Sequence, residues 1–328
     1  MKILVGAFSP AAAWVLPRPL LDQLRRDFPQ HLFIDTWDDE GIARHIVDVD
    51  VAFVHHVRRG MLASATRLGW IQSPAVGVGD MLFPEMVASP VIITSARGIR
   101  ARAIAEHVLG VGIALARRLH VAMRRQAGHD WAQDELEGAT TRIRTLRGCR
   151  MGIVGLGSIG LEVARVAAAF GLCVSAIRRR ADGPRPDGVD EVLPPDRLGE
   201  LLAKSDLVVL SAPLTPSTHS LIGARELARM KPGAFLINIG RGKLIEDDAV
   251  VAALQSGHLG GAALDVFTRE PLDPASPYWD LPNVIVTPHI SGAMADYWTH
   301  LVALFSDNLR RFERREPLVN VVDKTAGY

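Results

Sequence analysis

The sequence predicts an α/β protein with two doubly wound parallel sheets. Short apolar runs rich in β-branched residues alternate with helical patterns, which is typical of parallel strands covered on both faces. This alternation occurs twice, once before about residue 98 and once after about residue 150. The chain has 328 residues, of which 48% are hydrophobic, and this is enough for two packed cores.

The predicted strands are continuous apolar runs of three to five residues. Residues 2–5 are read as a strand and not as part of a signal peptide, because Gly6, Ser9 and Pro10 interrupt the apolar stretch early. The further strands predicted are 31–35, 51–55 and 91–94 in the first set, and 151–155, 173–177, 206–210, 234–238 and 284–288 in the second.

Helical spacing predicts two long helices, at 100–119 and at 294–312. Between the two sets of strands lies a polar segment, 124–148, which contains Trp131. Its composition fits either a solvated connector or an arm that reaches a partner subunit, and periodicity alone does not decide between them. The proline- and glycine-rich stretch 181–196 predicts a surface loop after a strand.

Composition excludes several classes of function. The 37 basic and 36 acidic residues leave a net charge of +1, which does not favour nucleic acid as a partner. No apolar run reaches the roughly 18 residues of a membrane span. Cys149 and Cys173 make neither a disulfide framework nor a zinc site, and we expect them to be small buried side chains at strand starts. We therefore expect a cytoplasmic protein without a metal.

A glycine-rich loop, GIVGLGSIG at 152–160, follows one predicted strand and opens a predicted helix. This context is that of the dinucleotide fingerprint of Rossmann-like domains. Gly155 permits the tight turn, Gly157 lets the backbone approach a pyrophosphate, and Gly160 lets the helix pack closely on the strand. The N-terminus of the helix then offers free N–H groups to the phosphates.

The tip of the second strand predicts which dinucleotide binds. An acidic residue there usually bonds the ribose 2′-hydroxyl of NAD, but strand 173–177 is followed by Arg178, Arg179 and Arg180. Arginines attract the 2′-phosphate of NADP through charge-assisted hydrogen bonds. We expect NADP(H) to be preferred, with NAD(H) as the weaker cofactor. The alternative is a solvated basic turn without a role in binding.

Further motifs lie later in the chain. NIGRG at 238–242 and TPHISG at 287–292 each directly follow a predicted strand, and DVFTREPL lies between them at 265–272. Ligands of open parallel sheets bind beyond the carboxyl ends of the strands. Arg241, Glu270 and His289 would all lie at that edge, and an arginine, a carboxylate and a histidine together suit carbonyl chemistry. The alternative for each is structural: a surface ion pair, a turn cap before Pro271, or a satisfied core histidine.

With these motifs the sequence resembles the D-isomer-specific 2-hydroxyacid dehydrogenases, in their glyoxylate and hydroxypyruvate reductase branch. The resemblance also rests on PLTPST at 213–218, AIAEH at 103–107 and the closing NVVDKTAGY, and it extends from about residue 70 to the end. It implies a homodimer and reduction of a small 2-keto acid to the D-2-hydroxy acid by hydride transfer. It also implies a flavodoxin-like substrate domain, 1–98 and 294–328, with an NAD(P)-binding domain, 99–293, inserted into it.

The resemblance implies a role for each matching residue. His289 would be the general acid and base, Glu270 would accept a hydrogen bond from its ring, and Arg241 would hold the substrate carboxylate. Val76 and Gly77 would bind that carboxylate through backbone N–H groups, although Ala75 stands where the family has a glycine. The other cofactor contacts implied are Ser158 and Ile159 at the pyrophosphate, Pro213 and Thr218 at the ribose, Asp265 at the nicotinamide amide, Ser291 and Gly292 at the nicotinamide edge, and Ile239.

Two rival functions share these features. One is a dinucleotide-binding regulatory protein, such as a corepressor, that has lost turnover; the intact Arg241, Glu270 and His289 speak against it. The other is a formate or phosphite dehydrogenase, which would need further anion-binding residues. The sequence leaves the particular acid open, because the pocket depends on the loops around 53–58 and 73–83.

Overall fold

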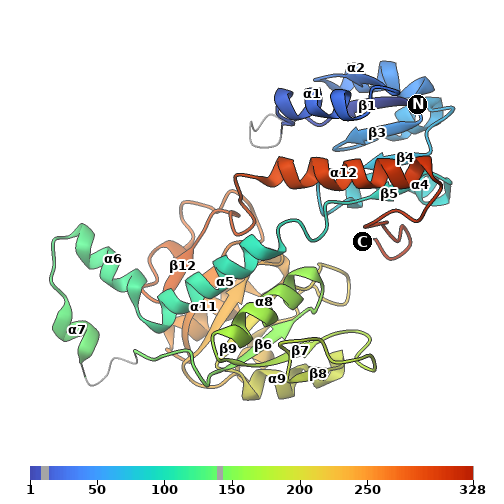
Figure 1. Ribbon diagram of the computed structural model, residues 1–328. Helices are drawn as coiled ribbons and strands as arrows, with labels where there is room; N and C mark the ends of the chain where they lie inside the picture. Colours follow the sequence, from blue (N-terminus) through green and yellow to red (C-terminus); the bar gives the residue numbers. More distant parts are fainter. Residues whose placement is uncertain (9–14, 139–142, 328) are drawn as a thin grey trace. The chain divides into compact units, whose positions relative to one another are not determined.

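The computed structural model describes residues 1–8, 15–138 and 143–327 (Figure 1). The chain forms two compact units, one from residues 1–99 together with the segment from Met294 onward, and the other from Arg100–Ala293. Each unit has a parallel sheet with helices on both faces, which confirms the predicted fold class.

The first unit has a five-stranded sheet in the order β2-β1-β3-β4-β5, the flavodoxin-like order. One face packs against α1 and α12 and the other against α2, α3 and α4. The elements are β1 (Lys2–Gly6), α1 (Arg18–Asp27), β2 (Leu32–Asp35), α2 (Asp39–His45), η2 (Ile46–Asp48), β3 (Val51–Val54), α3 (Arg59–Ser64), β4 (Trp70–Gln72), η3 (Gly79–Met81), α4 (Pro84–Ala88), β5 (Ile92–Thr94) and α12 (Tyr297–Glu313).

Helix α12 completes the core of the first unit, although it comes from the far end of the chain. Phe305 is fully buried and stacks on Phe53 and Trp70, with ring centroids 4.8 and 5.2 Å away. After the helix, Val321 bridges to Thr94 of β5. The sheet of this unit therefore has one of its faces covered by a helix that is separated from it by the whole second unit in sequence.

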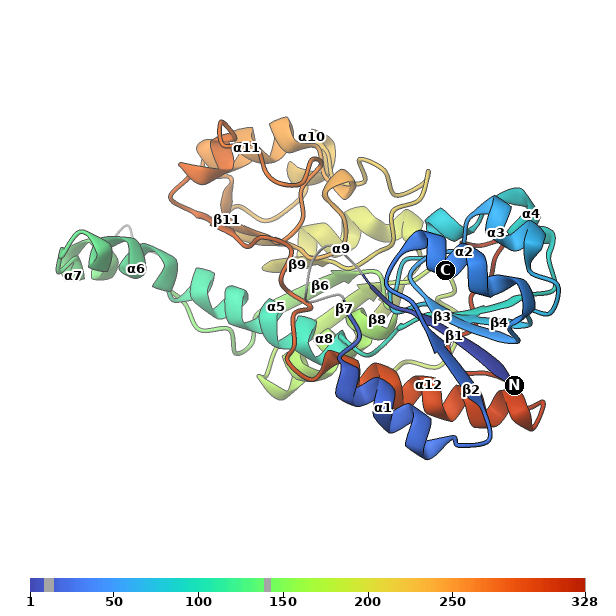
Figure 2. The same ribbon diagram turned by 90° about the horizontal axis from the view of Figure 1, so that it is seen from above.

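The second unit has a seven-stranded sheet in the order β12-β11-β10-β9-β6-β7-β8, the Rossmann order with its switch point between β6 and β9. Helices α5 and α8 pack on one face, and α9, α10 and α11 on the other (Figure 2). The strands are β6 (Arg150–Val154), β7 (Cys173–Ile177), β8 (Glu191–Leu193), β9 (Leu207–Leu210), β10 (Ala234–Asn238), β11 (Leu259–Leu264) and β12 (Val284–Val286). The helices are α5 (Ala101–Ala116), α6 (Leu119–Ala127), α7 (Gln133–Glu137), α8 (Ser158–Ala169), η4 (Pro195–Arg197), α9 (Leu198–Lys204), α10 (Ala224–Leu227), η5 (Gly242–Leu244), α11 (Asp247–Gln255) and η6 (Pro277–Trp279).

Some elements differ from the prediction. The helix expected over 100–119 ends at Ala116, because Arg118 has a left-handed φ of 55° that turns the chain before α6 begins. The loop expected over 181–196 contains the short strand β8. Cys149 is only partly buried and Cys173 is exposed, so the expectation that both cysteines are buried was wrong.

Helices α6 and α7 form an arm that projects from the end of α5, away from the sheet of the second unit, in both views (Figures 1 and 2). The arm begins at Leu119 and continues into the polar segment 124–148, of which residues 139–142 lie outside the described ranges. It is anchored at its base, where the Arg124 guanidinium donates to Leu281 O and Val284 O at 3.1 and 3.0 Å. Among the described residues, no helix is long and apolar enough to cross a membrane.

Candidate active site

The glycine loop forms the turn between β6 and α8, at the switch point of the sheet. Gly155 has a φ of +103°, and a Cβ there would lie 2.6 Å from Ala212 N. A Cβ on Gly160 would lie 2.1 Å from Gly155 O, so only glycine lets α8 approach the turn this closely. A Cβ on Gly157, in contrast, would meet nothing within 4 Å. The two outer glycines are thus required by packing, and the middle one faces open space.

The N-terminus of α8 fits a dinucleotide phosphate. Leu161 N–H donates to Gly157 O at 2.9 Å, so the N–H groups of Ser158, Ile159 and Gly160 precede the first turn and point out of the helix. None of the described side chains caps this end of the helix. Outward N–H groups, the positive end of the helix dipole and the open space at Gly157 together suit a pyrophosphate.

The arginine-rich tip of β7 is held by its own loop. Arg178 N–H donates to Leu193 O at 3.0 Å, and its Nε donates to Arg180 O at 2.7 Å. A Cβ on Gly183 would come within 3.1 Å of Arg178 Nη2, so the loop curls around this guanidinium. The tip is therefore a structured basic turn and its side-chain positions depend on the loop.

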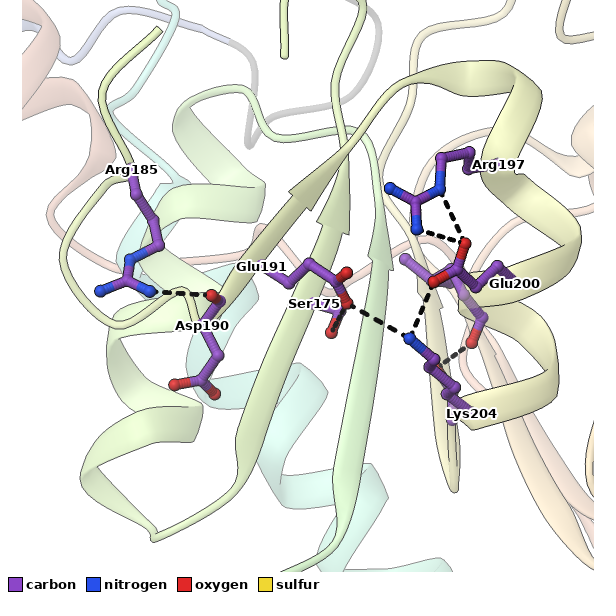
Figure 3. Close-up of polar contacts among 9 residues, drawn as sticks. Ser175, Arg185, Asp190, Glu191, Arg197, Glu200 and Lys204 are labelled. Atoms are coloured by element: carbon purple, nitrogen blue, oxygen red, sulfur yellow. Dashed lines mark hydrogen bonds and ion pairs between the residues drawn. The ribbon is translucent and has the colours of Figure 1, made fainter. Parts of the chain in front are cut away.

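The loop after this tip is tied down beside β8, as Figure 3 shows. Arg185 Nη1 donates to Asp190 O at 3.0 Å, before β8. On α9, Lys204 lies 2.8 Å from Glu200 and 3.8 Å from Glu191 of β8. The carboxylates of Glu191 and Glu200 are thus paired with cations along β8 and α9.

Arg241 follows β10 in a loop that the Asn238 side chain organises. Asn238 Oδ1 accepts from Gly240 N–H at 3.1 Å, and its Nδ2 donates to Arg241 O at 3.0 Å. A Cβ on Gly242 would lie 1.9 Å from the carbonyl carbon of Phe267, so glycine lets this loop touch the loop after β11. The exposed Arg241 side chain is thereby placed beside the segment that carries Glu270.

Glu270 and His289 form a hydrogen-bonded pair. Glu270 Oε1 accepts from Phe267 N–H at 3.0 Å, and Glu270 Oε2 lies 2.8 Å from His289 Nδ1. Partial burial opposes ionisation, but the hydrogen bonds from His289 and Phe267 and the positive charges of His289 and Arg241 lower the pKa of Glu270. A carboxylate only accepts hydrogen bonds, so the proton in this pair sits on His289 Nδ1.

The His289 backbone is held by the end of β11. His289 has a left-handed φ of 55°, and its N–H donates to Asp265 O at 2.9 Å. The Asp265 carboxylate, 1% exposed, accepts from the Thr287 hydroxyl at 2.6 Å and from Ile290 N–H and Ser291 N–H at 2.9 and 3.0 Å. Burial opposes ionisation of Asp265, yet the hydrogen bonds from Ser291, Thr287 and Ile290 lower its pKa. The turn 287–291 is therefore folded around a buried carboxylate.

The structure brings Arg241, Glu270, Asp265 and His289 together at the carboxyl ends of β10, β11 and β12. Of the remaining predicted contacts, Pro213 and Thr218 lie in a loop after β9 that closes on itself, and Ile239 is buried with its N–H bonded to Leu210 O. Val76 and Gly77 are exposed in the loop after β4 of the first unit. Gly292 packs on Arg100 of α5.

Three residues at this site were given no role from the sequence: Asn238, Thr287 and His107. Asn238 and Thr287 lie within the NIGRG and TPHISG motifs, and His107 ends the AIAEH motif. His107 Nε2 lies 3.5 Å from Thr287 Oγ1, a contact across 180 residues of sequence. The motifs thus pointed to these residues, but no pattern in the sequence indicated that the residues meet.

Comparison with known proteins decides the family. The profile of the "D-isomer specific 2-hydroxyacid dehydrogenase, NAD binding domain" matches residues 109–291, more than half of the chain and entirely within the second unit. The chain is a D-isomer-specific 2-hydroxyacid dehydrogenase. The predicted family is confirmed, and with it an oxidoreductase that uses a nicotinamide dinucleotide.

Relatives of this dehydrogenase include glyoxylate and hydroxypyruvate reductases. It is 34% identical over 315 residues to glyoxylate/hydroxypyruvate reductase B of Pectobacterium carotovorum, covering 90% of this chain and 92% of the relative. It is 31% identical over 320 residues to glycerate dehydrogenase of Methylorubrum extorquens, covering 94% and 98%.

Solved structures of the family have the same fold. A D-isomer-specific 2-hydroxyacid dehydrogenase from Xanthobacter autotrophicus Py2, in complex with NADPH and MES, matches with a TM-score of 0.81 at 30% identity, covering 99% of each chain. An NADPH-dependent glyoxylate/hydroxypyruvate reductase from Sinorhizobium meliloti, in complex with NADP and sulfate, matches with a TM-score of 0.79 at 28% identity, covering 100% of this dehydrogenase and 99% of that chain.

Proposed function

We propose that this dehydrogenase reduces a small 2-keto acid of the glyoxylate or hydroxypyruvate type to the D-2-hydroxy acid, with NADPH as the preferred cofactor. The observation that carries the proposal is the 2.8 Å pair of His289 Nδ1 and Glu270, with Arg241 beside it at the same edge of the sheet. Relatives named glyoxylate/hydroxypyruvate reductase support the substrate class.

His289 is the proposed general acid. The cofactor, when bound, supplies a hydride to the carbonyl carbon, and negative charge then develops on the carbonyl oxygen. Because His289 Nδ1 is engaged by Glu270, the proton for that oxygen comes from Nε2 of the imidazolium. The Glu270 carboxylate orients the ring through Nδ1 and keeps Nδ1 protonated after the transfer. In the reverse direction the neutral ring accepts the proton at Nε2.

Arg241 is the proposed clamp for the substrate carboxylate. Its planar guanidinium can hold a carboxylate with two parallel hydrogen bonds, and its charge also polarises the neighbouring carbonyl. One of its N–H groups, on Nη1, already donates to Gly240 O at 2.7 Å, which limits the rotation of the guanidinium. Backbone N–H groups of Val76 and Gly77 are proposed as a second set of donors to the same carboxylate.

The experiment that tests this function follows oxidation of NADPH with purified protein and a panel of acids. Reduction of glyoxylate or hydroxypyruvate, with D-configured product from the latter, is the expected result. Oxidation of formate or phosphite, followed in a second assay as reduction of NADP+ or NAD+, without 2-keto acid reduction would identify the rival dehydrogenase. Dinucleotide binding without turnover of any panel member would instead identify a regulatory protein.

We expect kcat/KM with NADPH to exceed that with NADH by about tenfold or more, and the variant Arg178→Asp to abolish or reverse this preference. A charge-assisted hydrogen bond from arginine to the 2′-phosphate contributes roughly 1.5–3 kcal/mol, and about 1.4 kcal/mol corresponds to tenfold. Aspartate at this position repels the phosphate instead. The measurement is the ratio of kcat/KM for the two cofactors in parent and variant.

The matched control for cofactor preference is Arg150→Asp. It makes the same charge change at the amino end of β6, the edge of the sheet opposite the glycine loop. Its cofactor ratio should equal that of the parent. A parent ratio near one, or a ratio that Arg178→Asp leaves unmoved, would show that the three arginines are only a solvated turn.

We propose a homodimer in which the arm of one subunit docks on the other. Along the arm, Met123 and Trp131 are 67% and 88% exposed, which is unusual for such large apolar side chains outside an interface. Light scattering at micromolar concentration should give twice the mass of the chain, and Met123→Glu with Trp131→Glu should shift it toward the monomer. Trp37→Glu in the first unit is the control that should leave the mass unchanged. A parent protein of monomer mass contradicts this assembly.

A further inference from the structure

The turn that carries His289 lies along one face of helix α5. At one end of the turn Thr287 reaches His107, with 3.5 Å between Thr287 Oγ1 and His107 Nε2. At the other end a Cβ on Gly292 would lie 3.0 Å from Arg100 Cδ and 3.6 Å from Ile104 Cδ1. Positions 100, 104 and 107 follow helical spacing and so share one face. The turn therefore runs antiparallel to α5, with His107 at its start.

Two hydrogen bonds link His107 to Asp265 through the Thr287 hydroxyl, and in both the proton is donated toward Asp265. The Asp265 carboxylate only accepts, so the Thr287 hydroxyl must donate its single proton to Asp265 Oδ1, at 2.6 Å. Thr287 Oγ1 then faces His107 as an acceptor, and His107 Nε2 must carry a hydrogen. Burial lowers the pKa of His107, although the Asp265 charge partly offsets this, which favours the neutral ring with its proton on Nε2.

The same carboxylate shapes the turn beyond Thr287. Asp265 Oδ1 is shared between Thr287 and Ile290 N–H, while Oδ2 takes Ser291 N–H. Between these contacts His289 is kept in a left-handed backbone conformation, which is unfavourable for a non-glycine residue. Any rotation of the Asp265 carboxylate would disturb both amide contacts and, through them, the direction in which His289 projects.

We propose that His107 is a positioning residue for His289: its Nε2–H holds the Thr287 hydroxyl on Asp265, and Asp265 holds the turn from which His289 reaches the substrate. His107 itself touches neither substrate nor cofactor in this scheme. The proposal rests on the proposed role of His289 as the acid, and it assigns a function to a helix residue three contacts away from the chemistry.

The test compares His107→Leu, which removes the donor, with His107→Gln, whose side-chain amide can donate from nearly the same place as Nε2. We expect His107→Leu to lower kcat for glyoxylate by about 3- to 10-fold, the effect of losing one neutral hydrogen bond. The Kd for NADPH should stay within about twofold, because the glycine loop at 155–160 provides the pyrophosphate site. His107→Gln should recover most of kcat.

A double-mutant cycle shows whether His107 acts through Thr287. Thr287→Val keeps the shape of the side chain and removes the hydroxyl. If the two residues act through the same series of hydrogen bonds, the double variant His107→Leu with Thr287→Val should lose no more kcat than the worse single variant. Thr287→Ser, which keeps the hydroxyl, is the matched control. Should His107→Leu fail to fold, His107→Met, whose side chain also lacks a hydrogen-bond donor, takes its place in the cycle.

A second readout does not depend on turnover. The ring resonances of His289, identified by their loss in His289→Ala, should shift in His107→Leu and Thr287→Val and return toward the parent in His107→Gln. A parent without 2-keto acid reduction would overturn the proposed function alone, and these resonances would still report on positioning. Parental kcat and unshifted resonances in His107→Leu, additive losses in the cycle, or no recovery with glutamine would each overturn the role of His107.

Discussion

Replacing His289 with alanine is expected to lower kcat for 2-keto acid reduction by at least about 100-fold, because a positioned general acid typically contributes about 100- to 10,000-fold. The variant removes the proton donor for the developing alkoxide. The cofactor pyrophosphate is proposed to bind at the loop 155–160, which the variant leaves unchanged, so the Kd for NADPH should change little. Steady-state kinetics and a fluorescence titration with NADPH measure the two quantities separately.

His300 offers a matched control within the same chain. It is also paired with a carboxylate, at 2.9 Å from Asp296, and its side chain is 55% exposed, against 53% for His289. His300→Ala should therefore retain parental kcat. Near-normal turnover of His289→Ala at neutral pH would show that another group supplies the proton.

Arg241→Lys is expected to lower kcat/KM for 2-keto acids roughly 10- to 100-fold, the effect of losing one charge-assisted hydrogen bond of about 1.5–3 kcal/mol. Lysine keeps the positive charge but loses the planar fork that matches a carboxylate. Both kcat and KM should worsen, since the clamp holds the carboxylate and polarises the carbonyl. The kinetics should be measured with glyoxylate and with a larger keto acid.

The control for Arg241→Lys is Arg225→Lys. The Arg225 side chain is 82% exposed and pairs with Glu226 on α10, so this variant makes the same exchange outside the proposed site. It should behave as the parent does. If Arg241→Lys matched the parent across keto acids, the substrate carboxylate would have to be bound elsewhere.

The sequence was most informative where apolar runs form buried strands. Every predicted run became a strand, whereas β4, β8 and β11 were missed for separate reasons. In strands β4 and β8 a polar residue, Gln72 or Glu191, leaves only two consecutive apolar residues, too few for a pattern. Strand β11 contains Gly260 and Gly261, where a Cβ would lie 2.5 Å from Gly233 O and 2.7 Å from Asn283 O. Close packing thus requires glycines here, and glycines interrupt the apolar, β-rich pattern by which a strand is recognised in the sequence.

The individual residues of the candidate site were more predictable from the sequence than the contacts between them. Arg241, Glu270 and His289 stood out because each lies within a motif, and the motifs of Arg241 and His289 directly follow a predicted strand. The residues that position them did not stand out. Their role depends on pairs such as Thr287 with Asp265 and His107 with Thr287, which only the packing of β11, β12 and α5 brings together. A pattern along one chain carries no information about which residues meet across separate elements.

The placement of α12 has a consequence for synthesis on the ribosome. The first 99 residues emerge before the segment Arg100–Ala293, which at about 5–20 residues per second takes roughly 10–40 s to translate. During that interval Phe53 and Trp70 lack Phe305, the ring on which both stack in the finished protein. The second unit is continuous in sequence and can fold as it emerges. The nascent N-terminal sheet is therefore a natural client for chaperones until its last helix leaves the exit tunnel.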